Sequence, residues 1–249
     1  MKLSTDKALL CFTFVDEIQD DKLLAEYQSM LPADELDKLG KFRFATHKKR
    51  YLVGRALLRT TLSKCVGIGP DLITFSRESH GRPFLMQYRQ NNNVQFNLSY
   101  TDGLVAVALI SGKQVGLDIE NTSRQIDCLD IARNYFAQKE YCELKLLSGP
   151  PRRIRFFEFW TQKEAYMKAR GLGLHLALDD VNFASSDNTT GPHLILMKDG
   201  RYWQFKLLNP SVTHKAAVCI GAASTSKIRI EYKKAVPLVR EDAFVMPME

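Results

Sequence analysis

Three carboxylates in two short segments could together hold a metal ion. In "VGLDIE", residues 115–120, Asp118 and Glu120 are two positions apart. If this segment is a strand, side chains alternate between its faces, so both carboxylates point the same way and stand about 7 Å apart. They then repel each other, and burial would raise the pKa of the group that ionises less easily. A divalent cation such as Mg²⁺ prefers carboxylate and phosphate oxygens, and it would relieve that repulsion.

The third carboxylate, Glu164, lies in "FWTQKEAYMKARGLGL", residues 159–174. At about 3.6 residues per turn, Trp160, Glu164 and Lys168 fall on one stripe of a helix. The phenylalanines before the stripe make this helix strongly apolar, and a carboxylate close to a core usually has a partner. A metal ion shared with the two strand carboxylates would be such a partner.

Each of these patterns also has an ordinary structural interpretation. Alternating acids occur on solvated strands, and Glu164 four residues before Lys168 would form a surface pair worth only about 0.2–0.5 kcal/mol. A third group, "HGRPF" with "FNLSYT", fits a turn followed by a strand. As a site, it would use Gly81 for a close backbone approach and the planar fork of Arg82 for a phosphate. The residue patterns alone leave these alternatives open.

Helices and strands must bring these segments together. Apolar periodicity predicts helices at 21–31, 33–40, 45–65, 126–147 and 152–170, with "SGPP" at 148–151 separating the last two. Alternation predicts strands at 8–15 and 72–76, a meander over 91–120, and later strands at 181–186, 193–197, 202–208 and 215–224. Helix-rich and strand-rich stretches follow each other twice. This order predicts an α+β fold of two similar α/β halves, residues 1–115 and 116–235, with a loosely attached tail at 236–249.

Composition and charge narrow the class of protein. Of 249 residues, 45% are apolar and 25% charged, as in ordinary soluble domains. The longest apolar run, 104–110, is far shorter than a membrane span, and the run at 8–15 is interpreted as a strand and not as a signal peptide. Five widely spaced cysteines without a CxxC argue against a disulfide framework or a zinc site, which favours the cytoplasm. The net charge of +7 is partly concentrated in the acid-free segment 41–59, which would bind an anion or be solvated.

The motifs "GRPF", "FNLSYTDG", "VGLDIE" and "FWTQKEAYMKARGLGL" follow one another in a recognisable order. They resemble G-[KR]-P, F-N-x-S-H, V-G-x-D-[IV]-E and W-[ST]-x-K-E-A-x-x-K, the motifs of the phosphopantetheinyl transferases of the Sfp type. The similarity also includes "HKKRYLVGRALLR" upstream and "KAAVCIGA" downstream, so it covers about residues 34–222. The last motif, with D-x-E before it, is quite specific, whereas "GRP" alone would be weak.

The resemblance implies an enzyme that moves 4'-phosphopantetheine from coenzyme A to a serine of an acyl, polyketide or peptidyl carrier protein. Adenosine 3',5'-bisphosphate would be released. The family fold is a pseudo-dimer with its site between the halves, the first binding coenzyme A phosphates and the second carrying the metal and the catalytic helix. Mg²⁺ would be held by Asp118, Glu120 and Glu164. Lys168 would neutralise the pyrophosphate, Trp160 would pack beside it, and Glu164 would be the candidate base for the serine.

The resemblance also implies a set of coenzyme A-binding residues, which is Lys38, Arg50, Arg82, Ser99, Tyr100, Lys163 and Lys168. Tyr100 departs from the family pattern, which usually has His there, and a phenol can donate a hydrogen bond but cannot become cationic. We expect a cytoplasmic monomer that acts neither on nucleic acid nor at a membrane. The two rival hypotheses are a basic nucleic-acid-binding protein, which leaves the three acids without a role, and a Mg²⁺-dependent phosphohydrolase, which needs no carrier protein.

Overall fold

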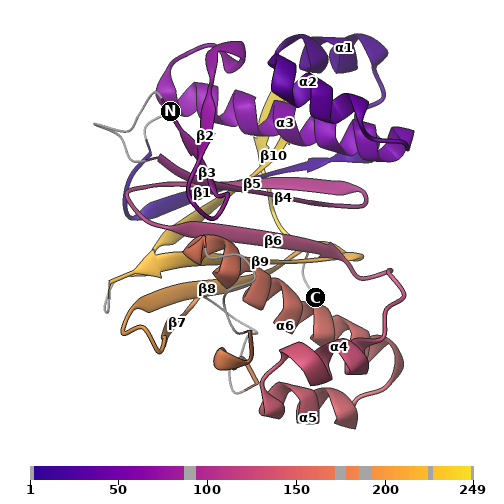
Figure 1. The fold of residues 1–249 in the computed structure, drawn as a ribbon, viewed down its shortest axis with the longest axis vertical. Helices are drawn as coiled ribbons and strands as arrows, with labels where there is room; N and C mark the ends of the chain where they lie inside the picture. Colours follow the sequence, from indigo (N-terminus) through magenta and orange to yellow (C-terminus); the bar gives the residue numbers. More distant parts are fainter. Residues whose placement is uncertain (1–2, 87–93, 172–177, 185–191, 224–226, 248–249) are drawn as a thin grey trace.

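Four layers stack in the order helices, sheet, sheet, helices (Figure 1). The computed structural model describes residues 3–86, 94–171, 178–184, 192–223 and 227–247. Within these residues the larger sheet has five strands and the smaller one four. We call the five-stranded sheet with its helices the first half, and the four-stranded sheet with its helices the second half. The predicted α+β pseudo-dimer is confirmed.

The first half is built mainly from the N-terminal part of the chain. Its helices are α1 (Asp21–Ser29), α2 (Ala33–Gly40) and α3 (Ala45–Val66), and its early strands are β1 (Lys7–Phe14), β4 (Val94–Thr101) and β5 (Leu104–Ser111). Two short strands, β2 (Phe75–Arg77) and β3 (Pro83–Leu85), pair with each other. One-turn 3-10 helices cover Val15–Glu17 and Pro70–Leu72. The helices predicted at 21–31, 33–40 and 45–65 are confirmed, whereas the strand predicted at 72–76 starts only at Phe75.

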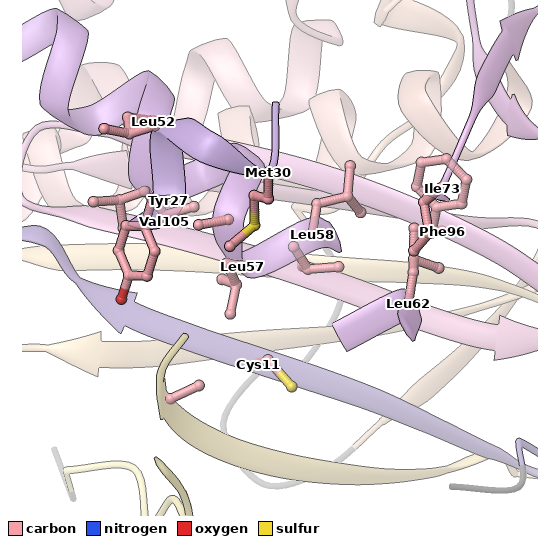
Figure 2. Packing of buried hydrophobic residues seen from close by; sticks show 14 of the residues in the cluster. Cys11, Tyr27, Met30, Leu52, Leu57, Leu58, Leu62, Ile73, Phe96 and Val105 are labelled. Carbon is pink, nitrogen blue, oxygen red and sulfur yellow. The ribbon is translucent and has the colours of Figure 1, made fainter. Parts of the chain in front are cut away.

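A core between the first sheet and its helices fixes the position of α3. Leu57, Leu58 and Leu62 of α3 gather with Cys11 of β1 and Val105 of β5, as Figure 2 shows. All five side chains are almost completely buried. Each large apolar side chain buried in this way contributes about 1.5–3 kcal/mol. This packing fixes the position of α3 on the sheet, and with it the positions of its basic residues.

The second half begins at β6 (Val115–Asn121), an edge strand that pairs antiparallel with β9 (His214–Ala222). The sheet continues through β8 (Tyr202–Ser211) to β7 (His193–Leu196). Helix α6 (Gly149–Arg170) covers its outer face, and α4 (Cys128–Tyr135) and α5 (Gln138–Leu146) pack against α6 on the side away from the sheet (Figure 1). The region predicted as one helix at 126–147 is thus two helices.

A break does separate α5 from α6, but it is shorter than predicted and does not extend through "SGPP", because α6 begins already at Gly149. Pro150 and Pro151 lie in the first turn, where the amides have no partner inside the helix and proline is tolerated. The helix ends at Gly171, whose left-handed φ of 66° suits glycine. A 3-10 helix covers Leu178–Asp180, and the strand predicted at 181–186 does not form at 181–184, while 185–186 lie outside the described residues.

A second core lies between the two sheets. Its members are apolar residues of the facing strands, including Leu10, Ala106, Leu117, Ile119 and Val218. Small alanines at several of these positions let the sheets approach each other. Among the described helices, none is both long and apolar enough to cross a bilayer.

The C-terminal segment is part of the first sheet. Strand β10 (Arg229–Val236) pairs parallel with β1, and β11 (Arg240–Ala243) pairs antiparallel with β10. Thr13 Oγ1 donates a hydrogen bond of 2.8 Å to Ala235 O, and the ring of Phe244 lies 5.5 Å from that of Phe12. The expectation of a loosely attached tail after residue 235 was therefore wrong for its described part, because strand pairing holds it.

Helix α6 lies directly on the backbone of β6 at Gly116. A Cβ atom added there would stand 1.9 Å from Ala165 O and 2.4 Å from Ala169 N. These neighbours are backbone atoms, which cannot rotate aside as a side-chain tip can. Only glycine permits this approach, and it brings the side chains of α6 close to those of β6.

We predict that Gly116→Ala lowers the free energy of unfolding by about 3 kcal/mol or more, because α6 must move away from the strand. Urea denaturation would measure the loss. Gly40→Ala is the matched control, since a Cβ there meets nothing within 4 Å. Equal stability of the two variants would contradict the close packing of α6 on β6.

Candidate active site

Strands β4 and β6 and helix α6 meet around the ammonium group of Lys168. Its Nζ lies 2.6 Å from Asp118 Oδ1, 3.2 Å from Ser99 Oγ and 3.3 Å from Leu117 O. Ser99 Oγ also lies 3.2 Å from Asp118 Oδ1. We call Ser99, Asp118, Glu120, Glu164 and Lys168 the junction. Each half of the molecule contributes to it, as the resemblance implied.

The carboxylates of the junction repel one another. Burial, and next the nearby charge of Asp118, raise the pKa of Glu164 to about 7, against the opposite effect of Lys168. Burial and Asp118 also raise the pKa of Glu120, although Arg124 Nη1 lies 2.8 Å from its Oε2. Asp118 Oδ2 is buried and has no hydrogen-bond partner. The junction therefore holds more negative charge than its neighbours neutralise.

The donor set of the junction fits a divalent cation. Carboxylate oxygens are the ligands that Mg²⁺ prefers, and the unpartnered Asp118 Oδ2 is a free acceptor. Over the described ranges, no three His, Cys, Asp or Glu side chains already stand in the arrangement of a metal site. Asp118 Oδ1 instead contacts Lys168. Binding a cation would thus require the carboxylates to move toward one another.

Side chains of β4 bond to the backbone of β6. The amides of Leu117, Ile119 and Asn121 donate hydrogen bonds of 2.9, 3.3 and 3.2 Å. The acceptors are the side-chain oxygens of Asn97, Ser99 and Thr101, in that order. The face of β4 that carries these three polar side chains therefore joins the two halves.

A cavity of about 400 Å³ opens on the other face of β4. Its lining includes Lys38, Tyr51, Arg77, Pro83, Leu98 and Tyr100. The Nζ of Lys38 lies 5.4 Å above the ring of Tyr51. Arg50 lies 5.6 Å above the ring of Tyr100 and forms an ion pair with Asp102. Asp34 and Glu35 also line the cavity, and Glu35 is paired with Arg55 and Arg59, which leaves Lys38 and Arg77 as the further cations of the lining. Aromatic rings with these cations suit a nucleotide bearing phosphates.

Lys163 does not join the junction or the cavity, although it was counted among the coenzyme A-binding residues. Its side chain is fully buried and lies 2.8 Å from Glu140 Oε2. It also donates hydrogen bonds to Leu178 O at 2.7 Å and Val181 O at 2.5 Å. Burial lowers its pKa, against the opposite effect of Glu140. The coenzyme A role for Lys163 was wrong, because this face of α6 packs into the second half.

Arg82 also lies differently from the expectation. It is only 8% exposed, and its guanidinium donates to Ala169 O at 2.8 Å and to Gln95 Oε1 at 3.0 Å, so it is turned inward and not toward a phosphate. Trp160 packs with the rings of Phe156 and Phe136, at 6.0 and 6.3 Å, and its place beside the charged groups stays a prediction. Residues 172–174 of the same motif lie outside the described residues.

Comparisons with known proteins agree with this arrangement. Residues 20–111 match the family model of the N-terminal domain of 4'-phosphopantetheinyl transferases, and residues 114–220 match the 4'-phosphopantetheinyl transferase superfamily. The chain is 32% identical to 4'-phosphopantetheinyl transferase HetI of a Nostoc species, over 67% of this chain and 70% of that one. It is 35% identical to 4'-phosphopantetheinyl transferase gsp of Aneurinibacillus migulanus, over 73% and 72%.

The chain belongs to the 4'-phosphopantetheinyl transferase superfamily. The transferase is therefore an enzyme that places the phosphopantetheine group on a carrier protein. A more distant relative, the L-aminoadipate-semialdehyde dehydrogenase-phosphopantetheinyl transferase of Xenopus laevis, is 25% identical over 76% of this chain and 67% of that one.

Sequence reasoning gave no role to several residues of the transferase that line or build the site. Asn97 lies within "FNLSYTDG", but the hydrogen bond that it accepts from Leu117 N depends on how the sheets meet. Arg77 lines the cavity without belonging to a motif, and Tyr51 lines it from the upstream segment "HKKRYLVGRALLR", in which it had been given no role. The basic segment 41–59 was the one signal that pointed toward this part of the surface.

The two lysines of α6 allow a matched comparison. Lys163→Met leaves the buried Glu140 uncompensated, so we expect a loss of about 3–5 kcal/mol in unfolding free energy. Lys168→Met removes a partly exposed ammonium at the junction, so we expect a folded protein with little transfer activity. Urea denaturation and transfer rates of both variants would measure this. A Lys163→Met protein that is as stable as wild type would contradict the buried pair.

The raised pKa of Glu164 predicts a pH-dependent stability in metal-free buffer. The protonated form is favoured in the folded state, so wild type loses stability as pH rises from about 4.5 to about 7. Glu164→Gln cannot ionise, and we expect it to be more stable than wild type by about 1–3 kcal/mol at pH 8, with the advantage lost near pH 4.

Thermal unfolding with EDTA at both pH values would test this, with the exposed Glu26→Gln as control. In separate samples with Mg²⁺ and no EDTA, the metal should stabilise wild type more than Glu164→Gln. A constant difference between wild type and Glu164→Gln at both pH values would mean that Glu164 ionises normally.

Proposed function

We propose that the donor is coenzyme A, that the acceptor is a carrier-protein serine, and that the reaction takes place at the junction. The observation that carries this proposal is the meeting of Lys168 with Asp118 at 2.6 Å, beside Glu164 and with Ser99 of the first half 3.2 Å from the same ammonium group. A cation and several acids at one point suit a pyrophosphate and a metal ion. Cleavage would release adenosine 3',5'-bisphosphate.

Asp118, Glu120 and Glu164 would hold Mg²⁺, which supplies charge neutralisation of the pyrophosphate when bound. Lys168 would donate hydrogen bonds to the same pyrophosphate and hold it in line with the serine. Glu164 would accept the serine proton, directly or through water, before the oxygen attacks. Its raised pKa in the metal-free protein makes it a better base, whereas metal binding would lower that pKa again.

The cavity would take the nucleotide part of coenzyme A. Lys38 and Tyr100 line it, and Arg50 lies at the ring of Tyr100. Leu98 and Tyr100 face this cavity, whereas Ser99 between them faces the junction. Because β4 lies at the edge of its sheet, the pyrophosphate of coenzyme A could pass around the outer edge of this strand. It would then lead from the cavity on one face of β4 to the junction on the other face. The first half would thus bind coenzyme A phosphates, and the second half would supply the metal ligands.

Transfer to isolated carriers tests the proposal directly. The protein, coenzyme A and Mg²⁺ are incubated with a panel of apo carriers from fatty-acid, polyketide and peptide synthases, and the carriers are weighed by mass spectrometry. We expect at least one carrier to gain one phosphopantetheine group at its serine. A serine-to-alanine carrier is the control. Nucleotide hydrolysis without any carrier modification would favour a phosphohydrolase instead. We place the enzyme in the cytoplasm, without contact to membrane or nucleic acid.

For the cavity, we predict that Lys38→Met weakens coenzyme A binding by about tenfold, because one charge-assisted hydrogen bond to a phosphate is lost. Calorimetric titration with coenzyme A and with dephospho-coenzyme A would show which phosphate is involved. Lys41→Met is the control, since Lys41 is an exposed neighbour that does not line the cavity. Unchanged affinity of Lys38→Met for both ligands would place the nucleotide elsewhere.

A further inference from the structure

The Arg82 side chain passes from the first half into the seam between β6 and α6. Its Nη1 donates a 2.8 Å hydrogen bond to Ala169 O, near the end of α6. Its Nη2 donates to Gln95 Oε1 at 3.0 Å and lies 3.4 Å from Val115 O, at the start of β6. One planar group thus contacts the catalytic helix, the metal-ligand strand and β4. A lysine has no comparable fork with which to reach several acceptors.

The acceptor on α6 is one that a helix leaves unsatisfied. The last four carbonyls of a helix have no partner inside it, and the partial negative charge there favours a cation. The amide of Gly171 bonds to Met167 O and Lys168 O, which leaves Ala169 O for Arg82. The aliphatic part of Arg82 is confined as well, because a Cβ added at Gly171 would lie 3.1 Å from its Cδ.

The two backbone acceptors stand next to the reacting groups in the sequence. Ala169 directly follows Lys168, and Val115 lies three residues before Asp118. The contact of Lys168 Nζ with Asp118 Oδ1 at 2.6 Å therefore has Arg82 bonded near both of its ends. Phosphate binding by Arg82 would require the guanidinium to leave these carbonyls in a site that is only 8% exposed.

We propose that Arg82 is a positioning residue that holds α6 and β6 at the spacing at which Lys168 and Asp118 meet. It acts through Lys168 and Asp118 and does not itself contact coenzyme A. The proposal rests on the proposed function of the junction. Its consequence is that loss of the fork changes the rate of transfer more than the affinity for coenzyme A.

Arg82→Met and Arg82→Lys test the proposal, with Arg240→Met on the exposed strand β11 as control. We expect Arg82→Met to lower kcat by roughly 100-fold through misplacement of the reacting groups. We expect its Kd for coenzyme A, titrated without metal, to stay within about twofold of wild type. Arg82→Lys should recover little of the rate, because charge without the fork does not restore both bonds. All rates are expressed per folded molecule, from unfolding curves of the same samples.

Other outcomes would overturn the proposal. A rise of about tenfold or more in the Kd of Arg82→Met, restored in Arg82→Lys, would show a phosphate contact, since lysine also binds phosphate as a point charge. Lower stability with unchanged kcat per folded molecule would show a purely structural role. If Arg82→Met does not fold, the Arg82→Lys comparison alone decides between these outcomes. Wild type and Arg240→Met must modify the carrier, and failure of both would refute the proposed function and not the role of Arg82.

Discussion

Among the described strands, β6 pairs with β9 alone, and side chains bond to the amides of its other edge. Buried backbone amides that lack a partner cost about 1–3 kcal/mol each. Asn97, Ser99 and Thr101 accept hydrogen bonds from alternate amides of β6, and Arg82 lies at the carbonyl of Val115. Side chains on one face of a strand repeat every two residues, as do the outward amides of an edge strand. The side chains of β4 can therefore pair with the amides of β6 in a single register. That register sets the position of Asp118 relative to Ser99.

The face of β6 that α6 covers must leave room for the backbone of the helix. Gly116, Asp118 and Glu120 share the face that α6 covers, and the missing side chain at Gly116 lets the helix backbone approach. Glu164 and Lys168 of α6 then lie beside Asp118. A larger residue at position 116 would lift the helix away and separate the reacting groups. Packing at one glycine and polar pairing along one edge together create the junction.

The sequence was sufficient for the parts of this arrangement that depend on local periodicity. Alternation in "VGLDIE" placed Asp118 and Glu120 on one face, and helical spacing placed Glu164 with Lys168. The inference from sequence failed for Lys163. Its neighbour Glu164 faces the junction, but each step along a helix turns the side chain by about 100°, so Lys163 points elsewhere. Motif membership could not show that Lys163 meets Glu140, which lies on another helix. The direction of Arg82 likewise depends on how two distant segments meet.

The C-terminal strands show the same limit. Residues 229–236 pair parallel with β1, which lies more than two hundred residues earlier in the sequence. No local sequence pattern predicts such a distant partner. Pro237 lies in the segment predicted to be loosely attached, yet its carbonyl accepts a 2.9 Å hydrogen bond from Tyr27 OH. Proline lacks only the donor, so it can end a strand and still bind through its carbonyl. The correct number of strands in the first sheet therefore depended on tertiary structure.

Buried acids are compensated differently at the junction and among the helices of the first half. Glu35 is as buried as Asp118, but Arg55 Nε lies 2.8 Å and Arg59 Nη2 2.6 Å from its oxygens. Against the effect of burial, these two guanidinium groups lower its pKa, so its charge is already compensated. Glu164 has the opposite shift, because burial and Asp118 outweigh Lys168. The same fold thus neutralises Glu35 with two arginines but leaves Glu164 under-compensated. The remaining negative charge is what an incoming cation would neutralise.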